Sequence, residues 1–434
     1  MGIEKFNPFI TEKAPGAFTE IPATYFANTV IVIDAHNYIY TNMYTALKYS
    51  LKDVNLRDDV GASHDNSVKM KTFLKQILRF IVNLTSYSIT PVFVFDGPNI
   101  YGKVVREKRR EANRKMQESK NKLEQTLEQI SPLERTDEDI EELRRLKGAV
   151  NKVEMDEMNL FKDVLKRIGV PVIQADGDGE HICCMMVREG LATAVYSRDT
   201  DCMVYGCPLM VKRLYKPSGK RYHVFEVTQF APILQSLRIS YKSFVDLCIM
   251  AKCDYNINIP GIGMTKAFNL IKKFKSIEEI AEAKDLDIEC LRHEFCRDQF
   301  RICRAKTLLY EPDHGDVIPP LVINKNALKT DDARRILRLY EADDMINPLV
   351  ASYRNIRSVV NRTADKLSVD GRVICMTDRV NIIIKGNPSE PVEVDGDQGE
   401  MENDGPIMAD DPLKIMGLGD ANNRDVEAEI ERYD

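Results

Sequence analysis

Acidic residues follow several short apolar runs in this chain, and their positions are the first indication of chemistry. Asp199 and Asp201 lie in the stretch 196–201 that follows the apolar run 191–195, and no lysine follows closely enough to neutralise both. In an extended segment, side chains two residues apart point to the same side. We therefore expect the two carboxylates to face one point, where their repulsion favours a divalent cation between them. A polar turn followed by a helix N-cap is the alternative, because aspartate is also common in both.

Three further strand candidates end in the same way, at Asp34, at Asp96, and at Asp178 with Glu180. In an open parallel sheet, ligands bind at the carboxyl ends of the strands. Carboxylates gathered there must either protonate or find cations, and oxygen-only ligands suit Mg²⁺ or Mn²⁺. Two such ions beside a basic surface can hydrolyse a phosphodiester, because they activate water and stabilise the leaving oxygen. These residues favour a metal-dependent nuclease or phosphatase, with structural caps and turns as the alternative.

Strands and helices must alternate to bring these acids together. Continuous apolar runs rich in β-branched residues indicate strands buried on both faces, as in a parallel sheet. Helical spacing of apolar residues appears at 35–50 and at 66–87. We predict an α/β fold with a mainly parallel twisted sheet flanked by helices and right-handed crossovers. The expected strands are 29–33, 91–95, 170–174, 191–195 and 209–211.

The composition changes between the second and third expected strands. Residues 103–122 contain nine Lys/Arg and three Asp/Glu, whereas residues 134–142 are strongly acidic. Pro132 lies between these two charged, helix-prone stretches. We predict two long helices that leave the body as a hairpin or arch, and a solvated hairpin without a special role is the alternative.

The net charge of −6 hides an uneven distribution. Residues 386–434 hold fifteen Asp/Glu and three Lys/Arg, a charge of −12, so residues 1–385 carry +6. A basic body can bind nucleic acid, and an acidic tail repels it or covers the empty binding face. The tail has few large apolar residues, so we expect it to be disordered.

Several classes of protein are not expected from the composition. Hydrophobic residues make up 44% and charged residues 29%, as in soluble globular proteins. No apolar run reaches about eighteen residues, so no transmembrane helix and no membrane partner are predicted. The first residues lack the layout of a signal peptide. The ten cysteines are scattered, which indicates buried thiols in a reducing intracellular compartment, and the six dispersed histidines argue against a zinc site.

A series of short motifs runs through the first three quarters of the chain: Met1-Gly2-Ile3, Ile33-Asp34-Ala35, Val92–Gly97, Asp178-Gly179-Glu180, Asp199–Cys202, Phe244–Ile249, Cys253-Asp254-Tyr255 and Ile259–Gly263. In order and spacing they resemble the flap endonuclease family, the XPG-like structure-specific 5′ nucleases. The resemblance covers roughly residues 1–310. It implies a PIN-like nuclease fold with a helical arch insertion and a helix-hairpin-helix-like DNA-binding region.

The resemblance also implies roles for individual residues. Lys103 matches the family's catalytic lysine at the base of the arch, and either Arg106 or Arg110 matches its arch arginine. Tyr40 matches an aromatic residue that stacks on a base beside the scissile bond; such stacking contributes about 1–3 kcal/mol per base. A core aromatic on a helix is the alternative for Tyr40. The implied metal ligands are Asp34, Asp96, Asp178, Glu180, Asp199, Asp201 and Asp254.

A second set of residues is expected to contact DNA without reading its sequence. Gly261 and Gly263 match the turn that grips duplex DNA, within a helix-turn-helix at 244–275, and Lys266 follows on the second helix. Small residues let backbone N–H groups approach a phosphate at a helix N-terminus. The resemblance adds Gly2 to the DNA contacts. These contacts should be sensitive to salt.

The sequence departs from the family's pattern at several points. Asp178 stands where the family has glutamate, and the arch segment is longer than in common cellular members. No Gln-x-x-Leu-x-x-Phe-Phe sequence follows residue 310, which argues against docking to a sliding clamp. The acidic tail 386–434 stands where cellular members have a basic tail. These departures suggest a member from a large DNA virus or a protist, acting in the nucleus or at a cytoplasmic replication site.

The expected activity is Mg²⁺-dependent cleavage of DNA at 5′ flaps or junctions in replication, repair or recombination, by a monomer with two metal ions that Mn²⁺ can replace. Alternatives are a 5′→3′ exonuclease or junction resolvase of the same family, and a DNA-binding scaffold without catalysis. The scaffold is disfavoured because a pure binder gains nothing from acids beside DNA. The expected segments are the two nuclease halves 1–102 and 157–315, the arch 103–156, the extension 316–385 and the tail 386–434.

Overall fold

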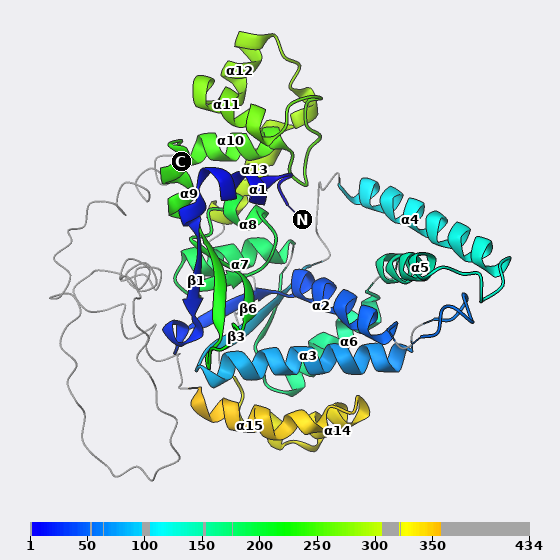
Figure 1. Cartoon of the computed structure of the whole chain (residues 1–434). Coiled ribbons are helices and arrows are strands. Elements are labelled where there is room, and N and C mark those ends of the chain that lie inside the picture. The colour runs from blue at the N-terminus through cyan, green and yellow to red at the C-terminus, as the bar shows by residue number, and fades with distance from the viewer. Residues whose placement is uncertain are drawn as a thin grey trace, which may run out of the picture.

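A computed structural model describes residues 2–52, 54–63, 65–97, 105–150, 153–175, 177–305, 321 and 323–356 (Figure 1). Within these ranges, the side chains of residues 105–110, 112, 149 and 301–305 are not described. The predicted acidic tail, 386–434, lies outside the described residues. None of the helices in the described ranges combines the length and the apolar character needed to cross a membrane.

Within the described residues, seven strands form one sheet in the order β1-β7-β6-β5-β2-β3-β4. The five strands from β6 to β4 are parallel neighbours, and β1 and β7 add an antiparallel pair at one edge. The predicted α/β fold with a mainly parallel sheet is therefore confirmed. The strand bounds are β1 Phe18–Pro22, β2 Val30–Asp34, β3 Thr90–Phe95, β4 Val172–Gln174, β5 Ala194–Tyr196, β6 Leu209–Tyr215 and β7 Val224–Gln229.

Helices cover both faces of the sheet, because the central strands are apolar on both sides. In β2, Val32 belongs to a core with the helices α1, α7, α9 and α10, whereas Ile33 packs with α2, α3 and α6. This alternation follows the period of two along a strand. The helix bounds are α1 Phe6–Lys13, α2 Ala35–Ser50, α3 Asn66–Ser86, α6 Met155–Arg167, α7 Gly179–Arg188, α8 Asp201–Val204, α9 Phe230–Leu237, α10 Tyr241–Ala251, α11 Met264–Phe274, α12 Ile277–Lys284 and α13 His293–Ala305.

Two further helices, α14 (Asp331–Leu339) and α15 (Ile346–Asn355), pack on the outer side of α3 and α6. The Thr85 hydroxyl of α3 donates to Ser352 Oγ at 2.8 Å. The Tyr353 hydroxyl donates to the Ile168 carbonyl, just beyond α6, at 3.1 Å. Figure 1 shows both helices beneath α3, on the side of the molecule away from α10 and α11. They add a second layer of helices to this face.

The predicted charged hairpin consists of α4 (Val105–Glu128) and α5 (Asp137–Val150), which lie side by side beyond the body (Figure 1). Its far end is held by the connection between α2 and α3. Leu56 of this connection packs with Leu127 of α4 in a small apolar cluster. The buried Arg135 side chain donates from Nε to the Leu127 carbonyl at 3.0 Å and from Nη1 to the Arg57 carbonyl, and Arg57 in turn donates to the Arg135 carbonyl.

Replacing Arg135 by alanine is expected to loosen the far end of the hairpin. The Arg57 carbonyl would lose its Arg135 donor, and the Leu127 carbonyl would keep only the Ile130 amide. A buried polar group left unpaired costs about 1–3 kcal/mol. Hydrogen exchange of the α4 and α5 amides would then become faster. Arg114→Ala is the control, because that side chain is exposed and its pair with Glu118 is 3.8 Å long. Equal acceleration in both variants would contradict the role given to Arg135.

Candidate metal centre

The carboxyl ends of β2 and β5 are joined by Asp34. Its side chain caps α2, with Oδ1 accepting from the Asn37 amide at 3.1 Å. Its Oδ2 accepts from the Ser197 hydroxyl, which follows β5, at 3.2 Å. The Ser197 hydroxyl oxygen also accepts from the Asp199 amide at 3.1 Å. Ser197 therefore connects Asp34 with the turn that carries Asp199 and Asp201.

The ends of β3 and β4 are joined in a similar way around α7. Asp96 Oδ1 accepts from the Gly179 amide at 2.9 Å, and its own amide donates to His36 Nδ1 at 3.1 Å. Asp178 caps α7, accepting from the Glu180 amide at 3.2 Å. A methyl group on Gly179 would stand 2.9 Å from Asp96 Oδ1, so glycine permits this close approach.

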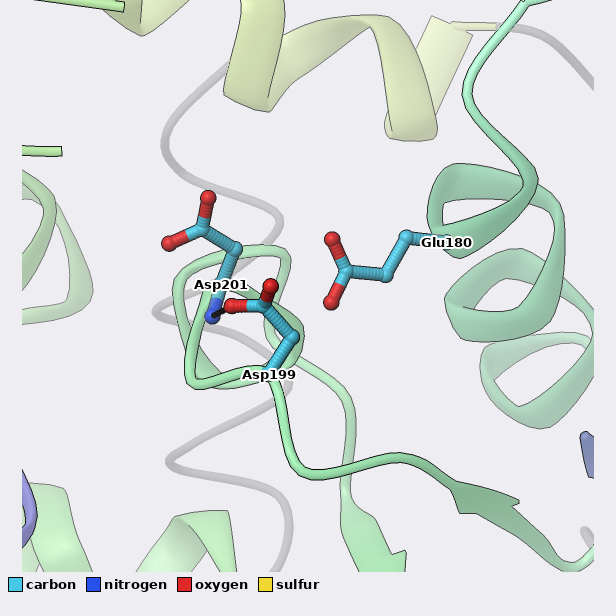
Figure 2. A group of neighbouring side chains, drawn as sticks. All are labelled: Glu180, Asp199 and Asp201. Atoms are coloured by element: carbon cyan, nitrogen blue, oxygen red, sulfur yellow. Dashed lines mark hydrogen bonds between the residues drawn. The ribbon is translucent and has the colours of Figure 1, made fainter. Parts of the chain in front are cut away.

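Glu180, Asp199 and Asp201 form the tightest acidic group among the described residues. Each offers a carboxylate oxygen within 4.8 Å of the others, and all three side chains are buried. Figure 2 shows the Glu180 carboxylate, carried by α7, pointing towards the turn that holds the two aspartates. Divalent cations lie about 2.0–2.6 Å from their oxygen ligands, so one ion fits between these groups.

The extended conformation predicted for Asp199 and Asp201 is wrong, although their convergence is correct. Asp201 is the first residue of the short helix α8, and Thr200 before it has helical dihedral angles. The Asp201 amide donates to Asp199 Oδ1 at 3.3 Å. A tight turn therefore brings the two acids together, because Asp199 binds the amide at the start of α8.

The N-terminal segment packs directly against this turn. The Ile3 amide donates to the Thr200 hydroxyl at 2.8 Å. Gly2 has φ of +80°, and a methyl group on it would stand 2.2 Å from Asp199 Oδ1. Gly2, predicted to contact DNA, is thus also the residue whose small size lets the N-terminus reach the Asp199 carboxylate.

Burial and mutual repulsion both disfavour the ionised acids. Burial, followed by the negative charge of Asp96, raises the pKa of Asp34 to about 8. Burial is also the main cause that raises the pKa of Glu180, with Asp199 next. The Cys202 thiol donates to Glu180 Oε1 at 3.3 Å. A centre of this kind binds a cation readily, because the cation offsets the cost of ionising the buried carboxyls.

Asp254 lies outside the three-carboxylate group. It follows α10 in a turn and is 6% exposed. The next residue, Tyr255, shares a hydrogen bond with the Tyr205 hydroxyl at 3.1 Å. Tyr205 in turn contacts His181, which follows Glu180 on α7. The predicted seventh ligand is therefore linked to α7 through two tyrosines.

The predicted basic residues of the arch lie at its start, around the beginning of α4. Lys103 lies outside the described residues, and Arg106 and Arg110 are in α4 without described side chains. Tyr40 is placed, and 49% of it is exposed. The alternative of a core aromatic is therefore wrong for Tyr40, and its contact with a base stays a prediction.

The predicted duplex grip forms an exposed turn between α10 and α11. Gly261 has φ of +78°, and Gly263 is the N-cap of α11. No heavy atom lies within 4 Å of a methyl group placed on either glycine. Lys266 is exposed in the first turn of α11. The backbone amides at the start of α11 are thus open to a phosphate.

Three residues that position the acids were not predicted: His36, Ser197 and Thr200. Each lies within two residues of a predicted ligand, and each binds its partner through a hydroxyl or ring nitrogen. Their positions beside the acids in the sequence are the signal by which they could have been found. Serine, threonine and histidine in such places indicate hydrogen bonds that orient neighbouring ligands.

The class of protein is indicated by three features: the parallel sheet, the acids at its carboxyl edge and the helical arch. Together they are typical of a nuclease fold, and comparisons with known proteins agree with this class. The models for the XPG N-terminal domain and the XPG I-region match residues 1–117 and 169–254. Over these residues the chain is similar to the XPG-like flap endonuclease family. The structure of flap endonuclease-1 from Methanococcus jannaschii aligns with a TM-score of 0.50 and 20% identity, covering 78% of this chain and 97% of that one.

Relatives by sequence include two proteins named Flap endonuclease 1. That of Plasmodium knowlesi (strain H) is 27% identical over 346 residues, which cover 76% of this chain and 52% of the relative. That of Cryptosporidium muris (strain RN66) is 30% identical over 292 residues, which cover 66% of this chain and 58% of the relative. The chain spans about half the length of the curated relatives it matches.

Proposed function

We propose that this protein is a structure-specific 5′ flap endonuclease that hydrolyses DNA phosphodiesters at junctions of single and double strands. The observation that carries the proposal is the buried group of Glu180, Asp199 and Asp201 at the carboxyl edge of the sheet. The names of the relatives support the choice of substrate. The products are a 5′ phosphate and a 3′ hydroxyl. This cleavage would serve DNA replication, repair or recombination.

The proposed cofactor is Mg²⁺, with two ions per site and Mn²⁺ as a substitute. All the candidate ligands are carboxylate oxygens, which these hard cations prefer. Glu180, Asp199 and Asp201 would hold one ion, and Asp34 and Asp96 belong to the surrounding acidic centre. When bound, such ions supply an activated water and stabilise the leaving oxygen.

The chain's own residues would hold and orient the substrate. Exposed amides at Gly263 and the cation of Lys266 suit the phosphates of the duplex. Tyr40 is half exposed on α2, whose first residue follows the metal-binding Asp34, and it suits a base beside the cut. The duplex grip and the acidic centre are joined by α10, so a bound junction lies across both.

A cleavage assay of the purified protein on a labelled panel of DNA structures tests the proposal. We expect cleavage of a 5′ flap in the presence of Mg²⁺ and none with a chelator. Preferred cleavage of a duplex with a recessed 5′ end would instead indicate the exonuclease alternative. Preferred cleavage of a four-way junction would indicate the resolvase. Binding of all these structures without any cleavage in Mg²⁺ would instead support the scaffold.

The stability of the metal-free protein is expected to fall as the pH rises from 5 to 8. Folding raises the pKa of Asp34 from 3.8 to about 8, so the folded state keeps a proton that the unfolded state releases. This contribution is fully present below pH 3.8 and is lost as the pH approaches 8. Mg²⁺ should therefore raise the melting temperature more at pH 8 than at pH 5.

Asp34→Asn provides the control for this pH dependence, since it keeps the size of the side chain but cannot ionise. Its metal-free melting temperature should fall less between pH 5 and pH 8 than that of the wild type. Parallel curves for the two proteins, measured by differential scanning fluorimetry, would show that Asp34 does not titrate in this range.

We propose that the protein acts in a reducing compartment, the nucleus or a viral replication site. The eight cysteines whose side chains the structure describes are free, and all but Cys290 are buried. Burial raises the pKa of thiols such as Cys183 and Cys248, which keeps them unreactive. We further propose a monomer that acts on DNA without a sliding clamp.

A further inference from the structure

Three side chains form a stripe along α2, starting at the acidic centre. His36, Tyr40 and Tyr44 are spaced four residues apart, so they lie on one face of the helix, one turn after another. His36 contacts Asp96, with Nδ1 3.5 Å from the carboxylate. The centroids of the His36 and Tyr40 rings are 6.5 Å apart. The stripe thus leads from the metal centre outwards.

Tyr44 lies at the outer end of this stripe, next to the helical arch. Its Cε2 atom is 3.7 Å from where a methyl group on Gly148 of α5 would stand. Arg144 of α5 donates to the Leu51 carbonyl at the end of α2, at 3.3 Å, which fixes the two helices beside each other. Figure 1 shows α2 running from the sheet towards α5. Despite this contact, 46% of Tyr44 is exposed.

Two half-exposed tyrosines at this spacing suit unpaired bases. Four residues of helix rise about 6 Å. Bases stacked in one strand of a duplex are only about 3.4 Å apart. Bases that stack on Tyr40 and Tyr44 together must therefore belong to an extended, unpaired strand. Aromatic stacking accepts any base, so this preference concerns structure rather than sequence.

We propose that Tyr44 forms a second stacking site, for the flap nucleotide that follows the base on Tyr40 away from the metals. The ligand class is an unpaired nucleobase on a single strand passing beneath α5. The site deepens the proposed flap endonuclease function and rests on it. Its consequence is a preference for flaps long enough to reach Tyr44 over flaps of a single nucleotide.

Tyr44→Leu tests this site, because leucine keeps an apolar side chain at this position but removes the ring. We expect kcat/KM to fall about 5- to 150-fold on a three-nucleotide flap, the equivalent of about 1–3 kcal/mol for one stacked base. A one-nucleotide flap should be cut as by the wild type. An abasic sugar at the flap nucleotide assigned to Tyr44 should slow the wild type by the same factor. It should slow Tyr44→Leu no further.

Tyr49→Leu is the matched control, since Tyr49 is 57% exposed on the same helix but lies off the stripe. It should cut both flaps at the wild-type rate. A readout apart from activity is the quenching of 2-aminopurine at that flap position on binding in a chelator, which Tyr44→Leu should lose.

Equal rates for the Tyr44 and Tyr49 variants on the longer flap would overturn the second stacking site, as would additive losses from Tyr44→Leu and the abasic sugar. Unquenched 2-aminopurine in the wild-type complex would also overturn it. A wild-type protein that cuts no flap at all would overturn the proposed function instead, so the two failures are distinguishable.

Discussion

Replacing Asp199 and Asp201 together by asparagine is expected to lower flap cleavage by at least about 10³-fold while junction binding persists. The two side chains supply carboxylates to the group with Glu180. A bound metal ion contributes several kcal/mol to transition-state stabilisation, and each 1.4 kcal/mol is about tenfold in rate. Binding is expected to persist because the predicted duplex grip lies elsewhere, in the turn between α10 and α11. Single-turnover cleavage and binding without metal measure the two effects.

The same double variant should fold at least as stably as the metal-free wild type. Asparagine keeps the shape of aspartate and removes the repulsion between buried carboxylates. Asp285→Asn with Asp287→Asn is the control, because these exposed acids have the same spacing in sequence. It should change cleavage by no more than about twofold, since surface changes are usually within 0.5 kcal/mol. Undiminished cleavage by the Asp199 and Asp201 variant would remove both residues from the metal centre.

Gly2→Ala is expected to lower cleavage about 100-fold, although alanine adds only one methyl group. That group would stand 2.2 Å from Asp199 Oδ1 and 2.9 Å from the Asp201 backbone nitrogen. Alanine at a φ of +80° is strained as well. Either the N-terminus or the acidic turn must shift, and a displacement of about 1 Å near the reacting groups can cost about 10²-fold.

Gly16→Ala is the control for this change, because no heavy atom lies within 4 Å of a methyl group placed there. It should cut at the wild-type rate. Titration with Mn²⁺ should show weaker metal binding in Gly2→Ala than in Gly16→Ala. Equal metal binding and equal cleavage would mean that the N-terminal segment moves aside without disturbing Asp199.

Local patterns were enough to predict most of the central sheet. The apolar runs ending at Asp34 and Asp96 correspond to β2 and β3, because strands buried on both faces are continuously apolar. The strands β1 and β7 were not predicted. They pair antiparallel at the edge of the sheet, where Glu20 and Glu226 lie opposite each other. Exposed polar residues of this kind interrupt the apolar pattern.

The acidic centre was predicted in part because its members follow strands. Asp254 could be found only through the family resemblance, since it follows the helix α10. Contacts between distant parts of the chain left no local signal. The Ile3 amide binds Thr200, 197 residues away, and the connection around Leu56 packs on the arch. Such contacts depend on the completed fold and cannot be read from spacing.

The outer layer made by α14 and α15 completes the apolar core on the α3 face of the sheet. The family match ends at residue 254, and every candidate ligand precedes residue 255. Yet Leu349 and Tyr353 are fully buried against the same core as Phe73 of α3. A fragment ending at residue 305 would keep the acids but expose this apolar surface to water, and exposed patches of this kind promote aggregation. A fragment that keeps this core covered therefore has to include α14 and α15.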